Sequence, residues 1–165
     1  MSNRAFVVFV SLVLALGLAT GYHLSTLPKL ETYKLLNIAG LCYDFLGIVV
    51  LSEITASIEK WKKISVELIA PTVLWLHTVF PLGMFIGGLL AALVVHGSSG
   101  SAVSKFSISF FVYSLTPLSI LDVAVAFPPF ASLKGLESRW RWFGLFLLLT
   151  GVGLQLVGAL LGLKA

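Results

Sequence analysis

The apolar stretches of this chain contain ionisable side chains that could do chemistry within a membrane, and the candidates are Asp44, His77 and Asp122. A titratable group at that depth is costly, so it normally faces a bundle interior, a polar partner or a water-filled path. Asp44 is the deepest carboxylate, because it lies midway along the apolar residues 35–52. We expect His77 at a similar depth. Such a pair could relay a proton or bind a cation, or it could join two helices through a hydrogen bond.

Asp44 belongs to a stripe of polar and small residues. The stripe consists of Asn37, Gly40, Asp44 and Gly47. Successive members are three, four and three residues apart, which places all of them on one face of a helix. Glycine on such a face lets a second helix approach closely, and the polar groups can then bond across the contact. We therefore expect Asp44 to point into protein.

A second stripe of this kind lies near the end of the sequence. Gly144, Gly151 and Gly158 recur every seven residues, and Gln155 and Gly162 follow the last two by four. Two further pairs have a spacing of four, Gly17 with Gly21 and Gly83 with Gly87. These glycine faces predict close helix packing, either within the chain or between copies of it.

Residues 106–127 carry another polar arc, which we expect to face inward. It consists of Ser109, Thr116, Ser119 and Asp122. Asp122 lies near the end of this stretch, so a carboxylate that reaches the headgroup region or caps a neighbouring helix is the alternative to a functional acid.

Metal and cofactor sites have weak support. His23 and His96 fall at the ends of two apolar stretches, on one predicted side of the membrane, and could bind a metal if their helices are neighbours. Two ligands make a weak site. His77 has no equally deep histidine to share a haem, which leaves only single axial ligation of a haem or pigment open. We predict no cofactor. Phosphate-binding, nucleophile-elbow, HExxH and CxxC motifs are absent, which favours a protein that is not an enzyme.

The composition indicates a membrane protein. Hydrophobic residues make up 58% of the chain and charged residues 11%, which leaves too little polar surface to cover a soluble globule. The formal charge of +4 does not indicate nucleic-acid binding, because the basic residues stand beside the apolar stretches, as topology signals do.

Five stretches approach the roughly 20 residues that a membrane-spanning helix needs. They are residues 5–24, 35–52, 69–95, 106–127 and 142–163. The predicted fold is therefore an all-α integral membrane protein, a bundle of five transmembrane helices in a single domain, 1–165. Because Asn37, Asp44 and Ser52 lower the hydropathy of the second stretch, four spans plus a re-entrant segment are the alternative. The first stretch also has the composition of a secretory signal peptide.

The distribution of Lys and Arg predicts the orientation. With five spans, seven of these residues fall on the side of the N-terminus and four on the other side. The positive-inside rule then places the N-terminus inside and the C-terminus outside. The host would be a bacterial inner or plasma membrane, or an organelle membrane.

Two segments are predicted to lie at the membrane surface. Residues 53–67 form an amphipathic connector with an apolar and a basic face, and residues 139–142 begin the last span. Their predicted lipid-interface residues are Lys60, Trp61, Lys62, Lys63, Arg139, Trp140, Arg141 and Trp142.

Two functions of different classes explain these features. The first is a non-catalytic subunit or assembly partner of a larger membrane complex, or a homo-oligomer packed through its glycine faces. The second is a minimal proton or cation transporter or channel that uses Asp44, with His77 and Asp122. An intramembrane enzyme or a single-histidine pigment protein comes third. The expected partners are the lipid bilayer and other membrane chains or further copies.

Overall fold

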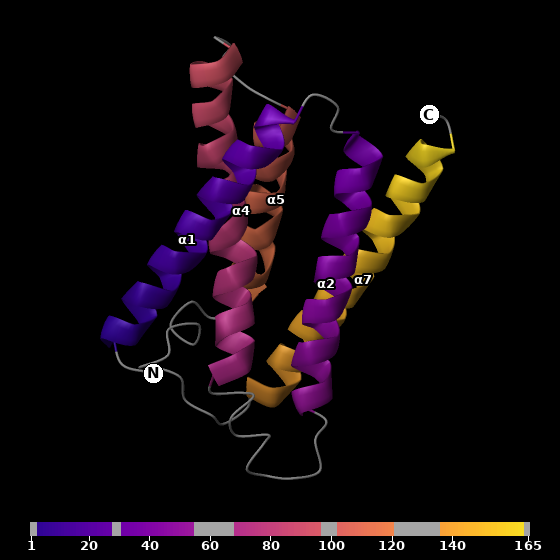
Figure 1. The fold of residues 1–165 in the computed structure, drawn as a ribbon. Coiled ribbons are helices and arrows are strands. Elements are labelled where there is room, and N and C mark those ends of the chain that lie inside the picture. The colour runs from indigo at the N-terminus through magenta and orange to yellow at the C-terminus, as the bar shows by residue number, and fades with distance from the viewer. Residues whose placement is uncertain (1–2, 28–30, 55–67, 97–101, 121–135, 164–165) are drawn as a thin grey trace. The chain divides into compact units, whose positions relative to one another are not determined.

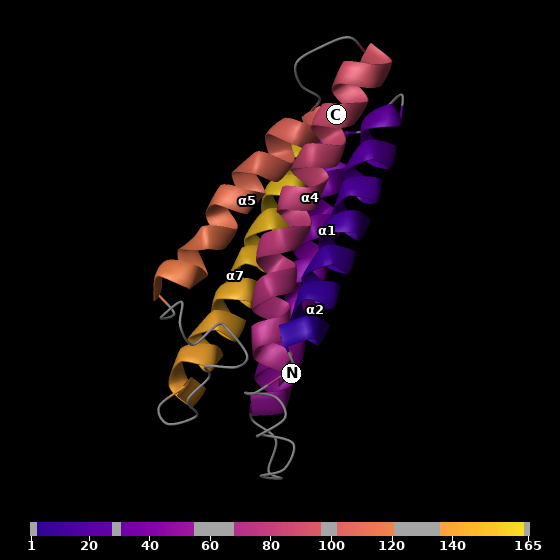
Figure 2. The same cartoon turned by 90° about the vertical axis from the view of Figure 1, so that its left-hand side faces the viewer.

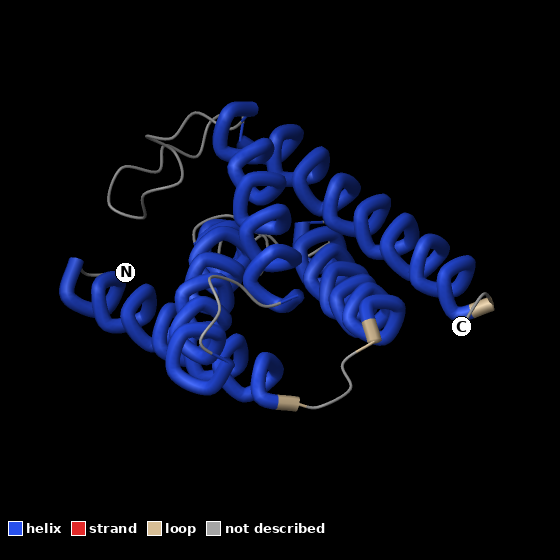
Figure 3. Tube along the Cα trace, turned by 90° about the horizontal axis from the view of Figure 1, so that it is seen from above, coloured by secondary structure: helices blue, strands red, loops and turns tan. Residues whose placement is uncertain are grey.

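The computed structural model describes residues 3–27, 31–54, 68–96, 102–120 and 136–163, and over these residues the regular structure is entirely helical (Figure 3). Five helices are present there (Figure 1): α1 (Asn3–Thr26), α2 (Thr32–Ile54), α4 (Ala70–His96), α5 (Ala102–Ile120) and α7 (Leu136–Gly162). Residues 55–67 of the predicted connector, which include Lys60, Trp61, Lys62 and Lys63, lie outside the described residues, and so does the predicted acid Asp122.

Four of the described helices are long and apolar enough to cross a membrane. The qualifying segments are Arg4–Thr26, Thr32–Ser52, Ala70–Val95 and Ser138–Gly162. The second stretch, for which a re-entrant segment was the alternative, is thus a continuous helix of 23 residues. Of the five described helices, α5 is the one outside this set. The architecture is that of a helical bundle suited to a membrane.

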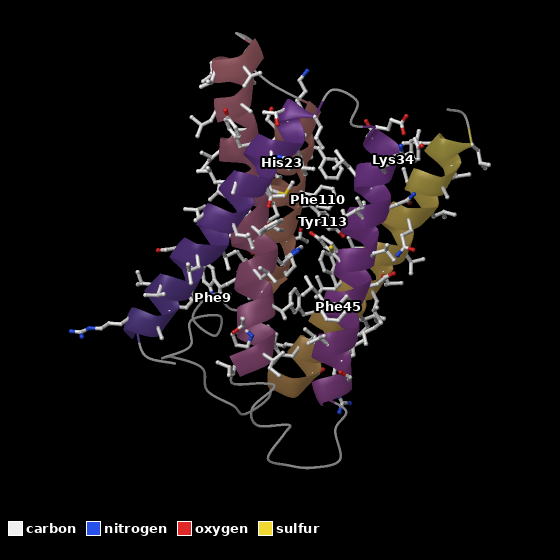
Figure 4. The ribbon with its side chains drawn as sticks, viewed as in Figure 1. Phe9, His23, Lys34, Phe45, Phe110 and Tyr113 are labelled. Carbon is white, nitrogen blue, oxygen red and sulfur yellow. The ribbon has the colours of Figure 1, made fainter. Side chains whose placement is uncertain are left out.

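Local side-chain contacts mark the end of α1 and the start of α2. At the end of α1, Thr26 donates its hydroxyl to the His23 carbonyl over 2.7 Å. At the start of α2, Lys34 Nζ lies 2.7 Å from Glu31 Oε2, and its amide donates to the Glu31 carbonyl. The hydrogen bond from Lys34 lowers the pKa of the Glu31 carboxyl. Lys34 stands near the start of α2 in Figure 4.

The described helices form two compact units whose segments alternate along the chain. The first unit comprises Met1–Lys29 and Leu74–Ala131, and so contains α1, α5 and most of α4. The second comprises Leu30–Val73 and Ser132–Ala165, and so contains α2, α7 and the first residues of α4. Each unit therefore combines helices that are distant in the sequence.

In the first unit, α1 and α4 meet through their glycines. A Cβ atom placed on Gly17 would lie 3.2 Å from Gly83 Cα, and one placed on Gly87 would lie 2.8 Å from the backbone nitrogen of Tyr22. The Phe6 ring meets the Trp75 ring edge-on at 5.4 Å between centroids, which adds an aromatic contact between α1 and α4. Figure 2 shows α1 running beside α4. The two predicted pairs of glycines thus face one another.

On another side of α4, Gly88 accommodates α5. A Cβ atom on Gly88 would lie 3.1 Å from the Ser104 backbone nitrogen. The buried face of α5 carries the small polar residues Ser104, Ser107 and Ser114. This face differs from the predicted inward arc, because Ser109 and Thr116 are exposed.

The exposure of Ser109, which was predicted to face inward, has a physical reason. Ser109 donates its hydroxyl to the Lys105 carbonyl one turn earlier, over 3.1 Å. A serine in an apolar helix can satisfy its hydroxyl in this way on its own backbone, so its polarity does not require an inward position. The inward prediction is therefore wrong for Ser109 and Thr116, whereas the side chains of Ser119 and Asp122 are outside the described part of the chain.

Candidate functional site

The candidate site is the contact between α2 and α7 in the second unit. The two helices run side by side in Figure 1 and make extensive contact along their lengths. They are antiparallel, since Tyr33 at the start of α2 lies against Gly162 at the end of α7, and Leu51 lies against Gly144. Both predicted glycine faces therefore meet each other inside one chain.

Each level of this contact places a glycine of one helix against a longer side chain of the other. We call these levels rungs, and the whole contact the α2–α7 seam. The rungs are Tyr33 with Gly162, Asn37 with Gly158, Gly40 with Gln155, Asp44 with Gly151, Gly47 with Leu148, and Leu51 with Gly144. The contributing positions alternate by four and three residues on both helices, which is the heptad spacing that keeps one face toward a partner helix.

The approach is too close for a side chain at Gly40 or at Gly47. A Cβ atom on Gly40 would lie 2.6 Å from Gln155 Cγ and 2.7 Å from the Gly151 carbonyl oxygen. One on Gly47 would lie 2.8 Å from Leu148 Cγ. Real Cβ contacts essentially never fall below 3.0 Å, so the helices could not keep this separation with alanine at these rungs.

Three consecutive rungs carry the polar groups of the seam. Gln155 donates from Nε2 to Asp44 Oδ2 over 2.5 Å. The other carboxylate oxygen, Asp44 Oδ1, packs on Gly151, and Asn37 Oδ1 packs on Gly158. Asp44 and Gln155 are both part-buried. The Asp44 carboxylate on α2 thus accepts a hydrogen bond from the neutral side-chain amide of Gln155 on α7.

No ion pair reaches this carboxylate from the described parts of α2 and α7. The nearest described cations along the two helices are Lys34 and Arg141, each about 15 Å along the axis from the Asp44–Gly151 rung at 1.5 Å per residue. Lys34 is engaged with Glu31. Among the described residues no hydrogen-bond donor reaches the buried Asp44 Oδ1.

The sequence placed Asp44, Asn37 and Gln155 in the interior without identifying which residues meet. The partner of Asp44 is Gln155, whereas His77 belongs to α4 in the first unit. The larger side chains that pack on the remaining glycines, Tyr33, Leu51 and Leu148, were not predicted as part of this contact. Aligning the two glycine stripes in antiparallel order would have found them, because every glycine then falls opposite a larger residue.

The predicted histidine candidates all belong to the first unit. His77 is 3% exposed within α4, and Thr78 beside it donates to the Leu74 carbonyl. His23 is exposed near the end of α1 (Figure 4), and His96 ends α4. Among the described residues no group of three or more His, Cys, Asp or Glu side chains is placed to hold a metal ion.

The start of α7 corrects one interface prediction. Trp142 is 67% exposed, and Arg139 and Arg141 are also exposed. Trp140, in contrast, is 1% exposed and meets the Phe143 ring edge-on at 5.9 Å between centroids. Alternating tryptophans on a helix point in different directions, so one of them packs into the protein.

The outward faces of the second unit are apolar. On α2 the exposed residues include Ile38, Leu41, Phe45 and Ile48, and Phe45 is labelled in Figure 4. On α7 they include Leu149, Val152, Leu156 and Leu160. The single cysteine, Cys42, lies on an exposed part of α2. These faces suit lipid or the apolar surface of another membrane chain.

Comparison with known proteins adds no relative, since no protein-family model, no curated protein and no solved structure matches this chain.

Proposed function

We propose that this protein is a non-catalytic, multi-pass membrane protein that serves as a subunit or assembly partner of a larger membrane complex. In this proposal five helices span the bilayer with the N-terminus inside, and α5 is the additional span. The four long apolar helices support membrane integration. The positive-inside distribution of Lys and Arg supports the orientation.

The observation that carries the proposal is the Asp44–Gln155 hydrogen bond inside the α2–α7 seam. A mid-span acid is the strongest chemical feature of the sequence, and one of its oxygens accepts a hydrogen bond from the other helix. A polar group that holds helices together needs no substrate to explain its presence. The site therefore favours a structural role for Asp44.

The exposed surfaces indicate where a partner would bind. The seam glycines already contact helices of the same chain, so they are not free for a second copy. Partner chains would instead contact the apolar outer faces of α2 and α7. This makes a complex with other membrane proteins a better fit than an oligomer packed through these glycines.

The deciding experiment is native mass spectrometry of the protein released gently from its own membrane. We expect a mass larger than the single chain, with other membrane proteins identified in the same particle. A monomer or pure homo-oligomer, obtained under conditions that preserve a known complex of the same membrane, would contradict the subunit role.

Asp44→Asn is expected to keep the fold and to lower the free energy of unfolding by at most about 1 kcal/mol, because an amide oxygen can still accept a hydrogen bond from Gln155. Asp44→Leu should cost about 1–3 kcal/mol, since it leaves the Gln155 amide without its partner. Reversible unfolding in mixed detergent micelles measures both values. Equal losses for the two variants would show that the hydrogen bond does not hold the helices.

A second function is favoured by one specific observation. Asp44 Oδ1 is a buried acceptor that no described donor reaches, as expected of a proton or cation site. In that case the chain would be a minimal transporter, with His77 and Asp122 as further candidates. Flux assays in liposomes separate the two functions, because a transporter should lose its flux in Asp44→Asn while staying folded.

A further inference from the structure

We propose that the start of α7 binds an anionic phospholipid, whose phosphate is held by Arg139 and Arg141 and whose acyl chain lies along an exposed apolar stripe of the same helix. This inference rests on the proposed membrane insertion of α7. It assigns a ligand of stated class to a surface that was predicted only to lie at the membrane interface.

The first observation is a continuous exposed stripe on α7. Its members are spaced alternately by four and three residues, which keeps them on one face of the helix. They are Ser138, Trp142, Leu145, Leu149, Val152 and Leu156. All of them are exposed, and from Trp142 to Leu156 the exposed fractions lie between 39% and 67%. The stripe therefore faces away from the α2–α7 seam.

The second observation is the position of two arginines beside the first residues of this stripe. Arg139 precedes Trp142 by three residues, and Arg141 precedes Leu145 by four, so each lies next to the stripe on the helix surface. Both arginine side chains are exposed. A guanidinium group can donate two parallel hydrogen bonds to a phosphate. The exposed Ser138 hydroxyl adds a further donor at the same level.

The third observation is the surplus of positive charge at this end of the helix. The first two turns of α7 contain two arginines and one acid, Glu137. Glu137 precedes Arg141 by four residues, the spacing of a helical ion pair, whereas Arg139 has no acidic residue three or four positions away. At the start of α2, in contrast, Lys34 Nζ lies 2.7 Å from Glu31 Oε2. The start of α7 therefore favours a lipid of net negative charge over a zwitterionic lipid.

The length of the stripe fits one leaflet of the bilayer. The apolar segment of α7 that is long enough to span begins at Ser138, so Arg139 and Trp142 lie at the headgroup level, where arginine and tryptophan are commonly found. From Leu145 to Leu156 the stripe extends about 17 Å along the axis at 1.5 Å per residue. One leaflet contributes about 15 Å, half of the hydrocarbon core. An acyl chain of the same lipid therefore covers the stripe.

The same features make a protein chain a poorer occupant of this stripe. A partner helix would have to bring carboxylates to the headgroup level to pair with the arginines, whereas a phospholipid carries its phosphate there. Charged residues are also depleted from the cores of protein interfaces. The outer face of α2, which includes Ile38, Phe45 and Ile48, remains for the partner chains of the proposed complex.

Native mass spectrometry of the purified protein in detergent tests the lipid selectivity. The protein is titrated with phosphatidylglycerol and, separately, with phosphatidylcholine that has the same acyl chains. We expect tighter binding of phosphatidylglycerol. Arg139→Gln should weaken this binding about fivefold, the fold-change that corresponds to about 1 kcal/mol per basic residue near an anionic surface. Equal affinities of the wild type for the two lipids would overturn the proposal.

Arg4→Gln is the matched control for charge. Arg4 is exposed at the start of α1, so the variant removes the same charge from the end of another span. It should keep the wild-type affinity for phosphatidylglycerol. An equal loss of affinity in Arg4→Gln and Arg139→Gln would mean that the lipid responds to net charge alone, which contradicts a site on α7.

A second measurement locates the lipid in a bilayer. Brominated acyl chains quench tryptophan on contact, and the Trp142 signal is the difference between the wild type and Trp142→Phe in vesicles. Brominated phosphatidylglycerol should quench this signal more strongly than brominated phosphatidylcholine at the same mole fraction, and Arg139→Gln should remove the difference. Equal quenching in the wild type would contradict the proposal. Both measurements use the protein without partner chains, so a missing complex and a missing lipid site are separate outcomes.

Discussion

Gly151→Ala is expected to destabilise the second unit, whereas Gly153→Ala, two residues away on the same helix, should stabilise the protein. At Gly151 the added methyl group would collide with the Asp44 carboxylate and lie 2.7 Å from the Gly40 carbonyl oxygen, so α2 and α7 must separate. Overpacking of this kind costs about 1–3 kcal/mol. At Gly153 a Cβ atom meets nothing within 4 Å, and alanine gains about 0.5–1 kcal/mol over glycine in a helix.

The opposite signs make the comparison decisive. Both variants replace glycine by alanine in the same helix. The difference between their free energies of unfolding is therefore free of the effects of helix propensity and detergent. Reversible unfolding gives the two free energies, and amide hydrogen exchange locates the change. Gly151→Ala should lower protection in α2 and α7 and leave α1 unaffected. Two substitutions with the same sign and size would refute the rung assignment.

Gly87→Leu is expected to destabilise the first unit. The free energy of unfolding should fall by about 3 kcal/mol or more, at the upper end of the costs of overpacking. Its Cβ would collide with the Leu18 carbonyl oxygen and lie 2.8 Å from the Tyr22 backbone nitrogen. Both contacts are backbone atoms of α1, which cannot rotate away as a side chain can. The only relief is separation of α1 from α4.

Hydrogen exchange provides the readout for this second variant. Protection should fall in α1 and α4, including the region of the Phe6–Trp75 contact, while α2 and α7 keep theirs. Gly153→Leu is the size-matched control, because it adds the same side chain to an open surface. If α2 and α7 lost protection as much as α1, the division into two packing units would be incorrect.

The helices themselves could be predicted from hydropathy and length. The expected stretch 35–52 became α2, and 142–163 became most of α7, with boundaries within a few residues except at the start of α7. Hydropathy determines these segments because a spanning helix must be apolar over its whole length. The start of α7 was placed too late, since Arg139 and Arg141 are charged and yet continue the helix.

The pairing of the helices could not be read from either stripe alone. A glycine face indicates that some helix can approach, and it contains no information about which helix does. That information lies in the matching of glycine with larger residues, such as Gly40 with Gln155 and Leu51 with Gly144, on two segments that must first be aligned. Polarity was a poor guide on α5, where Ser109 satisfies its hydroxyl on its own backbone.

The alternation of the two units along the chain has a consequence for biogenesis. The helices α1, α4 and α5 complete the first unit before α7 is translated, whereas α2 enters the membrane early and receives its seam partner last. During this interval Asn37 and Asp44 lack the glycines and the amide of α7. We therefore expect a membrane chaperone to bind α2 during this interval. Chains truncated before Leu136 lack α7, so we expect quality-control proteases to degrade them.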